Sequence, residues 1–269
     1  QLYPHWELCI ADDASTLPHV RAILEDYAAH DARIRVIYRT ENGHIAAATN
    51  SALAAATGDF VAFLDHDDTL APETLYLVAA AIAAQPQVEL LYSDEDSLDH
   101  RGRRVRPIAK PGFSPFLLRS HNYVSRLLVM RRALVNGLGG CRADLEGAQD
   151  HDLILRAVEN ISPQQICHIR SALYHWRIHA GSTAAGAKVT TSAAAFSRRA
   201  VAEHLQRVGI DASIEPVAGR PYVHHVCYPV PAQTRVSVII PTRDRLDLLR
   251  PCLDSLWTKT DFPELEVIV

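Results

Sequence analysis

The residues best suited to chemistry are Asp65, Asp67 and Asp68, which lie near the end of the run G-D-F-V-A-F-L-D-H-D-D-T at 58–69. The apolar residues 60–64 before them are typical of a buried strand. Ligands of α/β sheets bind beyond the carboxyl ends of the strands. Crowded carboxylates repel one another unless water or a cation screens them, and Mg²⁺ and Mn²⁺ prefer oxygen ligands. We therefore predict a divalent-metal and phosphate site at Asp65 and Asp67, with a solvated acidic turn as the alternative.

Other carboxylates stand where a strand ends or a helix begins. Asp13 follows the short apolar segment 7–11, where it either caps the helix expected from Pro18 or binds a ligand. Asp150 and Asp152 open a later helix, where both suit the positive end of the helix dipole. An aspartate held at such a position opposite a metal site would also suit a general base, which is the second interpretation of Asp150.

Cationic side chains alternate with other residues at His175, Arg177 and His179, after the predicted strand 169–174. A single histidine is more often structural than functional. An extended backbone, however, places all three side chains on one face, where their donors can grip phosphate.

Two further charged segments are predicted to be ordinary surface. The acidic run S-D-E-D at 93–96 is expected to be a solvated loop after a strand at 88–92. The basic block 101–110 is expected to be an exposed hairpin, with a diphosphate or an anionic membrane surface as alternative partners.

The elements that must position these residues alternate between strand and helix. The pattern predicts strands at 7–11, 34–38, 60–64 and 88–92, and helices at 18–30, 45–57 and 73–84. This alternation is typical of an α/β protein with a parallel sheet between layers of helices.

Composition narrows the classes of protein. The chain has 269 residues, 48% of them hydrophobic, which is enough for a substantial core, and its net charge of −4 argues against a general nucleic-acid binder. No apolar run in the sequence is long enough to span a bilayer. The dispersed cysteines predict reduced core thiols in a cytosolic protein rather than a disulfide framework or a zinc site; they are Cys9, Cys141, Cys167, Cys227 and Cys252.

The end of the chain repeats its beginning. Residues 262–269 (F-P-E-L-E-V-I-V) align with residues 3–10 (Y-P-H-W-E-L-C-I), which is a signature of tandem domains, and we expect the chain to be a fragment of a longer protein. The predicted organisation is a first domain at 1–208, a proline-rich extended connector at 209–234 and the start of a second domain at 235–269.

Four motifs in order carry a family resemblance: E-L-C-I-A-D-D-A-S, A-T-G-D-F-V-A-F-L-D-H-D-D, G-A-Q-D-H-D-L-I-L-R and Y-H-W-R-I-H. Together they resemble the family 2 glycosyltransferases of GT-A fold, and within them the tandem-domain enzymes of bacterial O-antigen synthesis, often described as rhamnosyltransferases. The resemblance implies a three-layer α/β/α sandwich with a mostly parallel, Rossmann-like sheet. It also implies inverting transfer of a sugar from a UDP- or dTDP-linked donor to a saccharide or lipid-linked acceptor.

The resemblance also implies roles for individual residues. Asp150 matches the catalytic base, and Asp67 matches the more direct ligand of a Mn²⁺ or Mg²⁺ ion at the D-x-D motif. The implied donor-binding residues are Asp13 at the nucleobase, Asp65 and Asp67 at the metal, His175, Arg177 and His179 at the diphosphate, and Asp244 in the second copy.

The chain departs from the family pattern at its start, because the family's first strand would precede residue 1. Only the second copy supplies such a strand, at 236–240. Residues 235–258 are therefore expected to fold back into the first domain, to swap between chains in a dimer, or to hang loose. Gln149 also stands where many relatives carry an acidic residue.

Two other functions stay open at this level. The run F-L-D-H-D-D-T-L resembles the nucleophile motif of haloacid-dehalogenase-like phosphatases, with Asp65 as the attacking residue. The other is a nucleotide-binding module without catalysis. We expect a cytoplasmic protein, with peripheral association at the inner face of the membrane as a further expectation.

Overall fold

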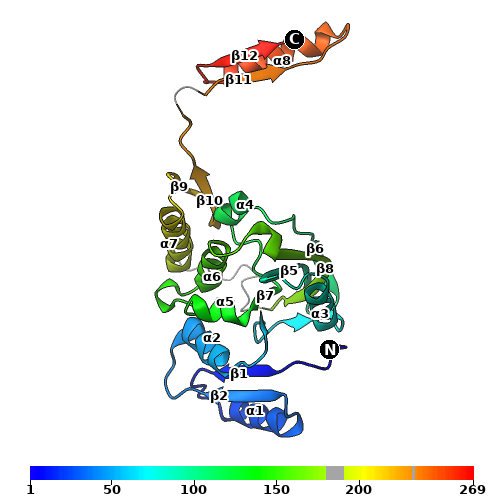
Figure 1. Ribbon diagram of the computed structural model, residues 1–269, viewed down its shortest axis with the longest axis vertical. Coiled ribbons are helices and arrows are strands. Elements are labelled where there is room, and N and C mark those ends of the chain that lie inside the picture. Colours follow the sequence, from blue (N-terminus) through cyan, green and yellow to red (C-terminus); the bar gives the residue numbers. More distant parts are fainter. Residues whose placement is uncertain (180–190, 232–233) are drawn as a thin grey trace. The chain divides into compact units, whose positions relative to one another are not determined.

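The structure, a computed structural model, describes residues 1–179, 191–231 and 234–269 (Figure 1). The chain forms two compact units, Gln1–Cys227 and Tyr228–Val269. The first unit carries the acidic motif and the predicted base.

The first unit begins with a parallel pair of strands, β1 (Leu8–Asp12) and β2 (Ile34–Tyr38), joined through α1 (Pro18–His30). A β-α-β crossover makes the two strands parallel, as the sequence predicts. Helix α2 (His44–Ala55) then leads to the main sheet.

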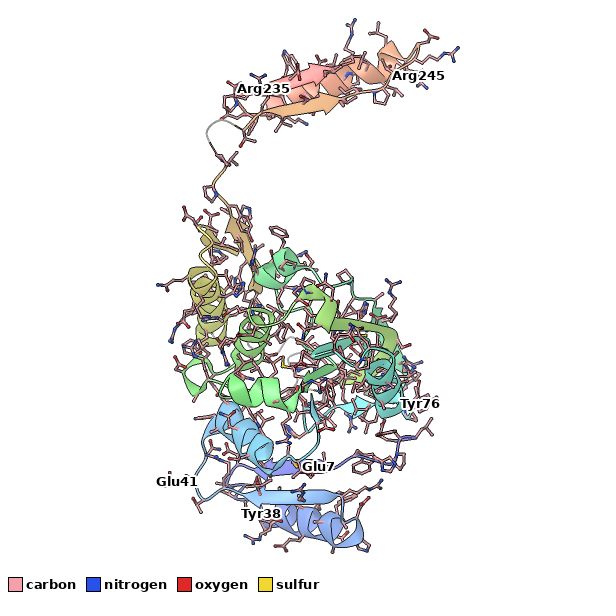
Figure 2. All side chains as sticks on the ribbon, viewed as in Figure 1. Glu7, Tyr38, Glu41, Tyr76, Arg235 and Arg245 are labelled. Carbon is pink, nitrogen blue, oxygen red and sulfur yellow. The ribbon has the colours of Figure 1, made fainter. Side chains whose placement is uncertain are left out.

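A glutamate ties this strand pair to the chain that enters the main sheet. Glu7, labelled beside β1 in Figure 2, accepts hydrogen bonds from the backbone N–H of Thr57 at 2.5 Å and of Gly58 at 2.8 Å. Its carboxylate also binds the guanidinium of Arg35 on β2. These contacts hold β1, β2 and the start of β3 together, although the residues are about fifty positions apart in sequence.

The main sheet has six strands in the order β3-β7-β5-β8-β4, with β6 paired to β5. Their bounds are β3 (Phe60–Phe63), β4 (Thr69–Leu70), β5 (Leu90–Leu98), β6 (Arg104–Ile108), β7 (Leu128–Arg131) and β8 (Ile166–Arg177). The β5–β8 pairing is parallel, and the others in this sheet are antiparallel. The α/β class is confirmed, but this sheet is mixed rather than mostly parallel, because β5 and β6 form a hairpin and β7 runs against both its neighbours.

Helices cover both faces of the sheet (Figure 1). On one face α3 (Thr74–Ala84) packs Val78 against Leu91 and Val129. The alternate residues, including Leu90 and Met130, point to the other face. That face is covered by α5 (Arg132–Gly137), α6 (Gln149–Val158) and α7 (Thr191–Arg207). The expected three layers are therefore present.

Short elements complete the first unit. Helices α4 (Pro115–Ser120), η1 (Ala143–Leu145) and η2 (Pro163–Gln165) lie in the connections. Strands β9 (Ser213–Val217) and β10 (Arg220–Cys227) form an antiparallel hairpin.

The hairpin corrects the predicted connector at 209–234. Ile214 and Val226 pack against the core, so residues up to 227 belong to the first unit. Gly219, at φ +71°, makes the turn of this hairpin. The prolines of the segment indicated an extended connector instead.

The second unit contains β11 (Val236–Ile239), α8 (Leu246–Lys259) and β12 (Leu265–Ile268). Its two strands pair in parallel, from Val236 opposite Leu265 to Ile239 opposite Ile268. The strand-helix-strand pattern predicted for 235–269 is confirmed.

Among the described residues, no helix combines the length and the apolar character that crossing a membrane requires. All five cysteines are free. Cys141 is buried as predicted, but Cys252 is exposed, so the expectation of core thiols is wrong for that residue.

Candidate active site

The acidic motif forms a tight turn between β3 and β4. The backbone N–H of Asp68 donates to the carbonyl of Asp65 at 3.2 Å. This closes the turn and gathers carboxylate oxygens of Asp65, Asp67 and Asp68 within 4.8 Å of one another. The structure therefore brings together the three carboxylates that the sequence singled out, and we call them the acidic turn.

Asp68 has a structural role within the acidic turn. Its side chain accepts hydrogen bonds from the hydroxyl of Tyr174 at 2.6 Å and from the backbone N–H of Arg177 at 2.9 Å. The residue is only 8% exposed, and burial raises the pKa of its carboxyl group. Asp68 therefore holds the turn against β8.

Asp67 is better placed for a cation. Nε2 of His179 lies 2.8 Å from its Oδ2, and its side chain is 29% exposed. Burial acts to raise the pKa of Asp67, but His179, the backbone and the charge of His66 outweigh burial and lower it. An ionised carboxylate that reaches solvent beside a second carboxylate fits the oxygen preference of Mn²⁺ or Mg²⁺.

Asp65 pairs with a cation that no sequence motif indicated. A guanidinium nitrogen of Arg126 lies 2.8 Å from its Oδ2. The same guanidinium lies 5.6 Å from the ring centroid of Tyr174 and 5.5 Å from that of Trp176. Arg126 stands in a loop before β7 without a recognisable pattern, so only the fold reveals that it faces the acidic turn.

Asp150 lies in the first turn of α6, as predicted. Its Oδ2 accepts a hydrogen bond from Nδ2 of Asn122 at 3.1 Å, and its Oδ1 accepts one from the backbone N–H of His151 at 2.8 Å. Burial acts to lower the pKa of Arg126, but the charges of Asp65, Tyr174, Asp150 and Asp68 contribute to a net rise. Asp150 and Asp65 thus act on the same guanidinium from elements far apart in sequence.

Two polar atoms in this region have no hydrogen-bond partner among the described residues. They are Nε of Arg126 and Oδ1 of Asn122, and both are buried. Buried polar atoms in native proteins are normally satisfied, so unpaired ones are suited to bind a ligand. These atoms belong to the residues that contact Asp65 and Asp150.

Asp13 has a different role from the predicted helix cap. Helix α1 is preceded by Leu17, and no side chain caps it. Asp13 instead accepts hydrogen bonds from Nε of Arg39 at 2.7 Å and from the backbone N–H of Gly43, directly before α2, at 3.0 Å. The N–H of Gly43, followed by Arg39, lowers the pKa of Asp13. The carboxylate therefore stays ionised at the junction of β1, β2 and α2.

The acidic run 93–96 is not the predicted solvated loop. It continues β5, and each carboxylate has a basic partner. The pairs are Asp94 with His168 at 2.7 Å, Glu95 with Lys110 at 2.8 Å, and Asp96 with His175 at 2.6 Å and with Arg104 at 2.6 Å. The prediction was wrong because the basic partners come from β6, from Lys110 just after it, and from β8.

The alternating basic residues His175, Arg177 and His179, at the end of β8 and just beyond it, are therefore already partly engaged. His175 is buried against Asp96, whereas His179 binds Asp67. The backbone of Arg177 binds Asp68, and the residue is exposed. The basic block 101–110 includes the expected hairpin strand β6, and Arg104 and Lys110 pair with the carboxylates of β5.

Asp244 lies in the second unit, after β11. Its side chain is 93% exposed, and its Oδ2 lies 3.8 Å from Nε of Arg243. Its contribution to donor binding remains a prediction.

Known proteins resemble this chain in sequence and in fold. The family model of glycosyl transferase family 2 matches residues 1–135. The whole chain is 46% identical over 269 residues to the O-antigen biosynthesis protein RfbC of Myxococcus xanthus, and it spans 21% of that protein's length.

Solved structures share the fold. S. aureus TarS in complex with UDP-GlcNAc superimposes with a TM-score of 0.60 at 21% identity, over 76% of this chain and 59% of that one. The mannosyltransferase PcManGT from Pyrobaculum calidifontis, in complex with GDP-Man and Mn²⁺, gives a TM-score of 0.52 at 19% identity, over 77% of this chain and 56% of that one. The predicted GT-A fold is confirmed, and because the family model covers half of the chain, the chain belongs to the family 2 glycosyltransferases.

Proposed function

We propose that this chain is an inverting glycosyltransferase that moves a sugar from a UDP- or dTDP-linked donor to a saccharide or lipid-linked acceptor in bacterial surface polysaccharide synthesis. The observation that carries the proposal is the acidic turn, which gathers carboxylate oxygens of Asp65, Asp67 and Asp68 within 4.8 Å of one another and pairs Asp65 with Arg126 at 2.8 Å. The similarity to an O-antigen biosynthesis protein and the UDP-GlcNAc bound to TarS support the substrate class.

A divalent cation, Mn²⁺ or Mg²⁺, would be held by Asp67 with Asp65 beside it. PcManGT, which shares the fold, contains Mn²⁺. Bound there, the cation would neutralise the charge that develops on the leaving diphosphate. The chain's own basic side chains lie beside this position: His179 lies at Asp67, and the guanidinium of Arg126 lies at Asp65.

The chain's own residues would carry the proton and orient the substrates. Asp150 accepts the proton of the acceptor hydroxyl while that oxygen bonds to the anomeric carbon. The bond from this carbon to the diphosphate oxygen breaks, and the nucleoside diphosphate leaves with the electron pair. Asn122 holds the carboxylate of Asp150 in place. Asp13 would contact the nucleobase, and Arg177 with His179 would contact the diphosphate.

The test measures nucleoside diphosphate release from a panel of UDP- and dTDP-sugars, with calorimetric titration of UDP and dTDP in the presence of Mn²⁺. We expect Asp150→Asn to abolish turnover and to retain nucleotide affinity, because the base does not contact the nucleotide. Asp67→Asn is expected to remove the dependence of nucleotide binding on Mn²⁺. Asp211→Asn, an exposed aspartate next to β9, is the matched control and should resemble the wild type.

The possible results distinguish the alternative functions. Nucleotide binding without turnover of any donor, in the full-length protein, would favour the binding-module alternative. A trapped phospho-aspartate at Asp65 would favour the phosphatase. Nucleotide affinity that is unaffected by chelator and by Asp67→Asn would contradict the metal-dependent mechanism.

A further inference from the structure

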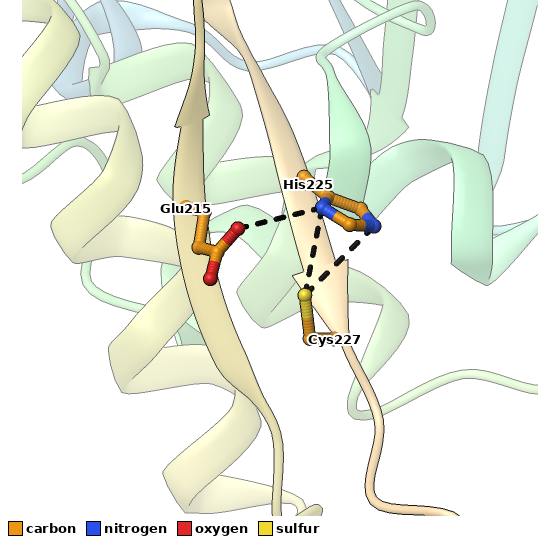
Figure 3. Close-up of side chains that lie close together, drawn as sticks. All are labelled: Glu215, His225 and Cys227. Atoms are coloured by element: carbon orange, nitrogen blue, oxygen red, sulfur yellow. Dashed lines mark hydrogen bonds and ion pairs between the residues drawn. The ribbon is translucent and has the colours of Figure 1, made fainter. Parts of the chain in front are cut away.

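Three side chains with metal-binding atoms lie together on the outer face of the β9–β10 hairpin (Figure 3). Glu215 of β9 is directly opposite His225 of β10, and Cys227 lies two residues beyond His225. Alternate residues of a strand point to the same face, so His225 and Cys227 project together. His224, the residue directly before His225, points to the opposite face, toward the core, and is 2% exposed.

The distances between their ligand atoms suit one small cation. Nδ1 of His225 lies 3.5 Å from Sγ of Cys227 and 3.6 Å from Oε2 of Glu215. All three ligand atoms lie within 4.8 Å of one another. In a tetrahedral zinc site, bonds of about 2.0–2.3 Å place neighbouring ligand atoms about 3.3–3.6 Å apart. The hairpin therefore holds these groups close to zinc-ligand spacing before any metal binds.

Interactions among the three side chains alone do not account for this convergence. The side chains of His225 and Glu215 are 66% and 65% exposed, and exposed ion pairs of this kind contribute little to stability. The contact of 3.5 Å between the thiol and the imidazole is weak by itself. A cation that binds all three would use the thiol, the imidazole and the carboxylate at once.

The chemistry of the ligands selects the metal. A thiolate, an imidazole and a carboxylate are all common ligands of Zn²⁺, whereas the acidic turn offers only oxygen. We propose that Glu215, His225 and Cys227 form a Zn²⁺ site that leaves a fourth position open to water. The cysteines are dispersed in sequence, which argued against zinc, but the hairpin register supplies the missing ligands from neighbouring strands.

The site would also affect the hairpin itself. Cys227 pairs with Ser213 at the end of the ladder that is remote from the turn. A metal that bridges Cys227 and Glu215 would fasten β9 to β10 at this open end. Zinc should therefore raise the melting temperature of the wild-type protein, because a ligand that binds only the folded state stabilises it.

The test uses the whole chain, reduced with a phosphine and freed of metal by dialysis. Co²⁺, which serves as a coloured substitute for Zn²⁺, should produce a thiolate charge-transfer band in the near ultraviolet, and Zn²⁺ should abolish it. Competition with a chromogenic chelator measures Zn²⁺ affinity, which Cys227→Ser and His225→Gln should each lower at least about tenfold. Glu215→Gln should lower it as well.

Two controls separate this site from other metal-binding groups. Cys252→Ser removes an exposed thiol outside the proposed site and should leave the band intact. Asp67→Asn weakens the acidic turn, which has no sulfur ligand, and should also leave the band intact. The absence of the band in the wild type, its persistence in Cys227→Ser, or its loss in Cys252→Ser would overturn the proposal. None of these outcomes depends on glycosyltransferase activity.

Discussion

At the scale of single residues, the neighbours of the proposed base matter as much as the base. Asn122 donates to Oδ2 of Asp150, while its own Oδ1 is buried without a partner among the described residues. The amide of Asn122 and the backbone N–H of His151 each hold one carboxylate oxygen of Asp150, and a remaining lone pair on either oxygen can receive the proton of the acceptor. Asn122 is therefore a positioning residue in the proposed mechanism.

Asn122→Ala tests this role. A hydrogen bond to a charged group is worth about 1.5–3 kcal/mol, so we expect kcat to fall about tenfold to a hundredfold. The donor KM should stay unchanged, because Asn122 contacts the base and not the acidic turn. Steady-state kinetics measure both constants, and Asn160→Ala, which removes an exposed amide on another helix end, is the control. An unchanged kcat would remove Asn122 from the mechanism.

At the scale of elements, the side chain of Asn50 helps to fasten α2 to the loop before α6. Asn50 donates to the carbonyl of Cys141 and accepts from its backbone N–H, both at 2.8 Å. Gly140 lies beside it at φ +72°, and a Cβ there would be 2.4 Å from Oδ1 of Asn50. The loop thus needs glycine both for its conformation and for this close approach.

A pair of glycine substitutions separates the two requirements. Gly102→Ala, at φ +73° with open space around the Cβ, should cost only backbone strain of about 1–2 kcal/mol. Gly140→Ala carries the same strain and also displaces Asn50, so we expect it to destabilise the protein by at least about 1 kcal/mol more. Denaturant unfolding measures both, and equal losses would show that the Asn50 contact does not matter.

Buried histidines lie where α4, α6, α7 and β10 meet. His151 Nε2 lies 2.8 Å from the carbonyl of Leu118, its Nδ1 is 3.3 Å from Oγ of Ser197, and that hydroxyl is 2.9 Å from Nε2 of His224. Burial lowers the pKa of His151 to about 4. Burial also lowers the pKa of three other histidines, His121, His204 and His224.

These histidines make the fold sensitive to acid. Above an unfolded-state pKa of about 6.5 they are neutral in both states, so stability does not change with their titration. Below it the unfolded chain binds protons that the folded chain does not. Stability therefore falls toward pH 4, by about 1.4 kcal/mol per pH unit for His151 alone. Urea unfolding between pH 7 and 5 should show this slope.

The variant His151→Gln isolates one histidine. It should lower stability at every pH, since it disturbs a buried hydrogen bond, but it should also flatten the dependence on pH by about one proton. The exposed His100→Gln serves as the control and should keep the wild-type slope. An unchanged slope in His151→Gln would show that its protonation does not limit acid stability.

At the scale of the whole molecule, the first unit extends beyond the boundary at residue 208 that the sequence predicts. The hairpin of β9 and β10 contributes Ile214 and Val226 to the core, which the predicted boundary at residue 208 would remove. The compact unit ends at Cys227 instead.

Truncation distinguishes these boundaries. We expect a chain of residues 1–227 to melt near the temperature of the first unit in the full chain. A chain of residues 1–208 should be destabilised by several kcal/mol, since burial of a large aliphatic side chain contributes about 1.5–3 kcal/mol. Thermal unfolding followed by circular dichroism compares the two. Equal melting temperatures would support the original connector.

Local pattern was enough to predict most elements and the acidic turn. The helix at 18–30 and the strand at 34–38 match α1 and β2, because each is encoded by its own periodicity. The predicted strand 88–92 ends too early, because β5 continues through residues 93–96. Consecutive carboxylates resemble a loop in a sequence that does not show their basic partners.

The sequence by itself determined the order of the motifs, the α/β class and the family, because these follow from residue types and short spacings. Only the tertiary structure decided which carboxylate of the acidic turn has a structural role and which is available to a cation. Asp68 is held by Tyr174, 106 positions away, whereas Asp67 stays open to solvent. Such roles depend on burial and on partners brought from distant strands, which no local pattern contains.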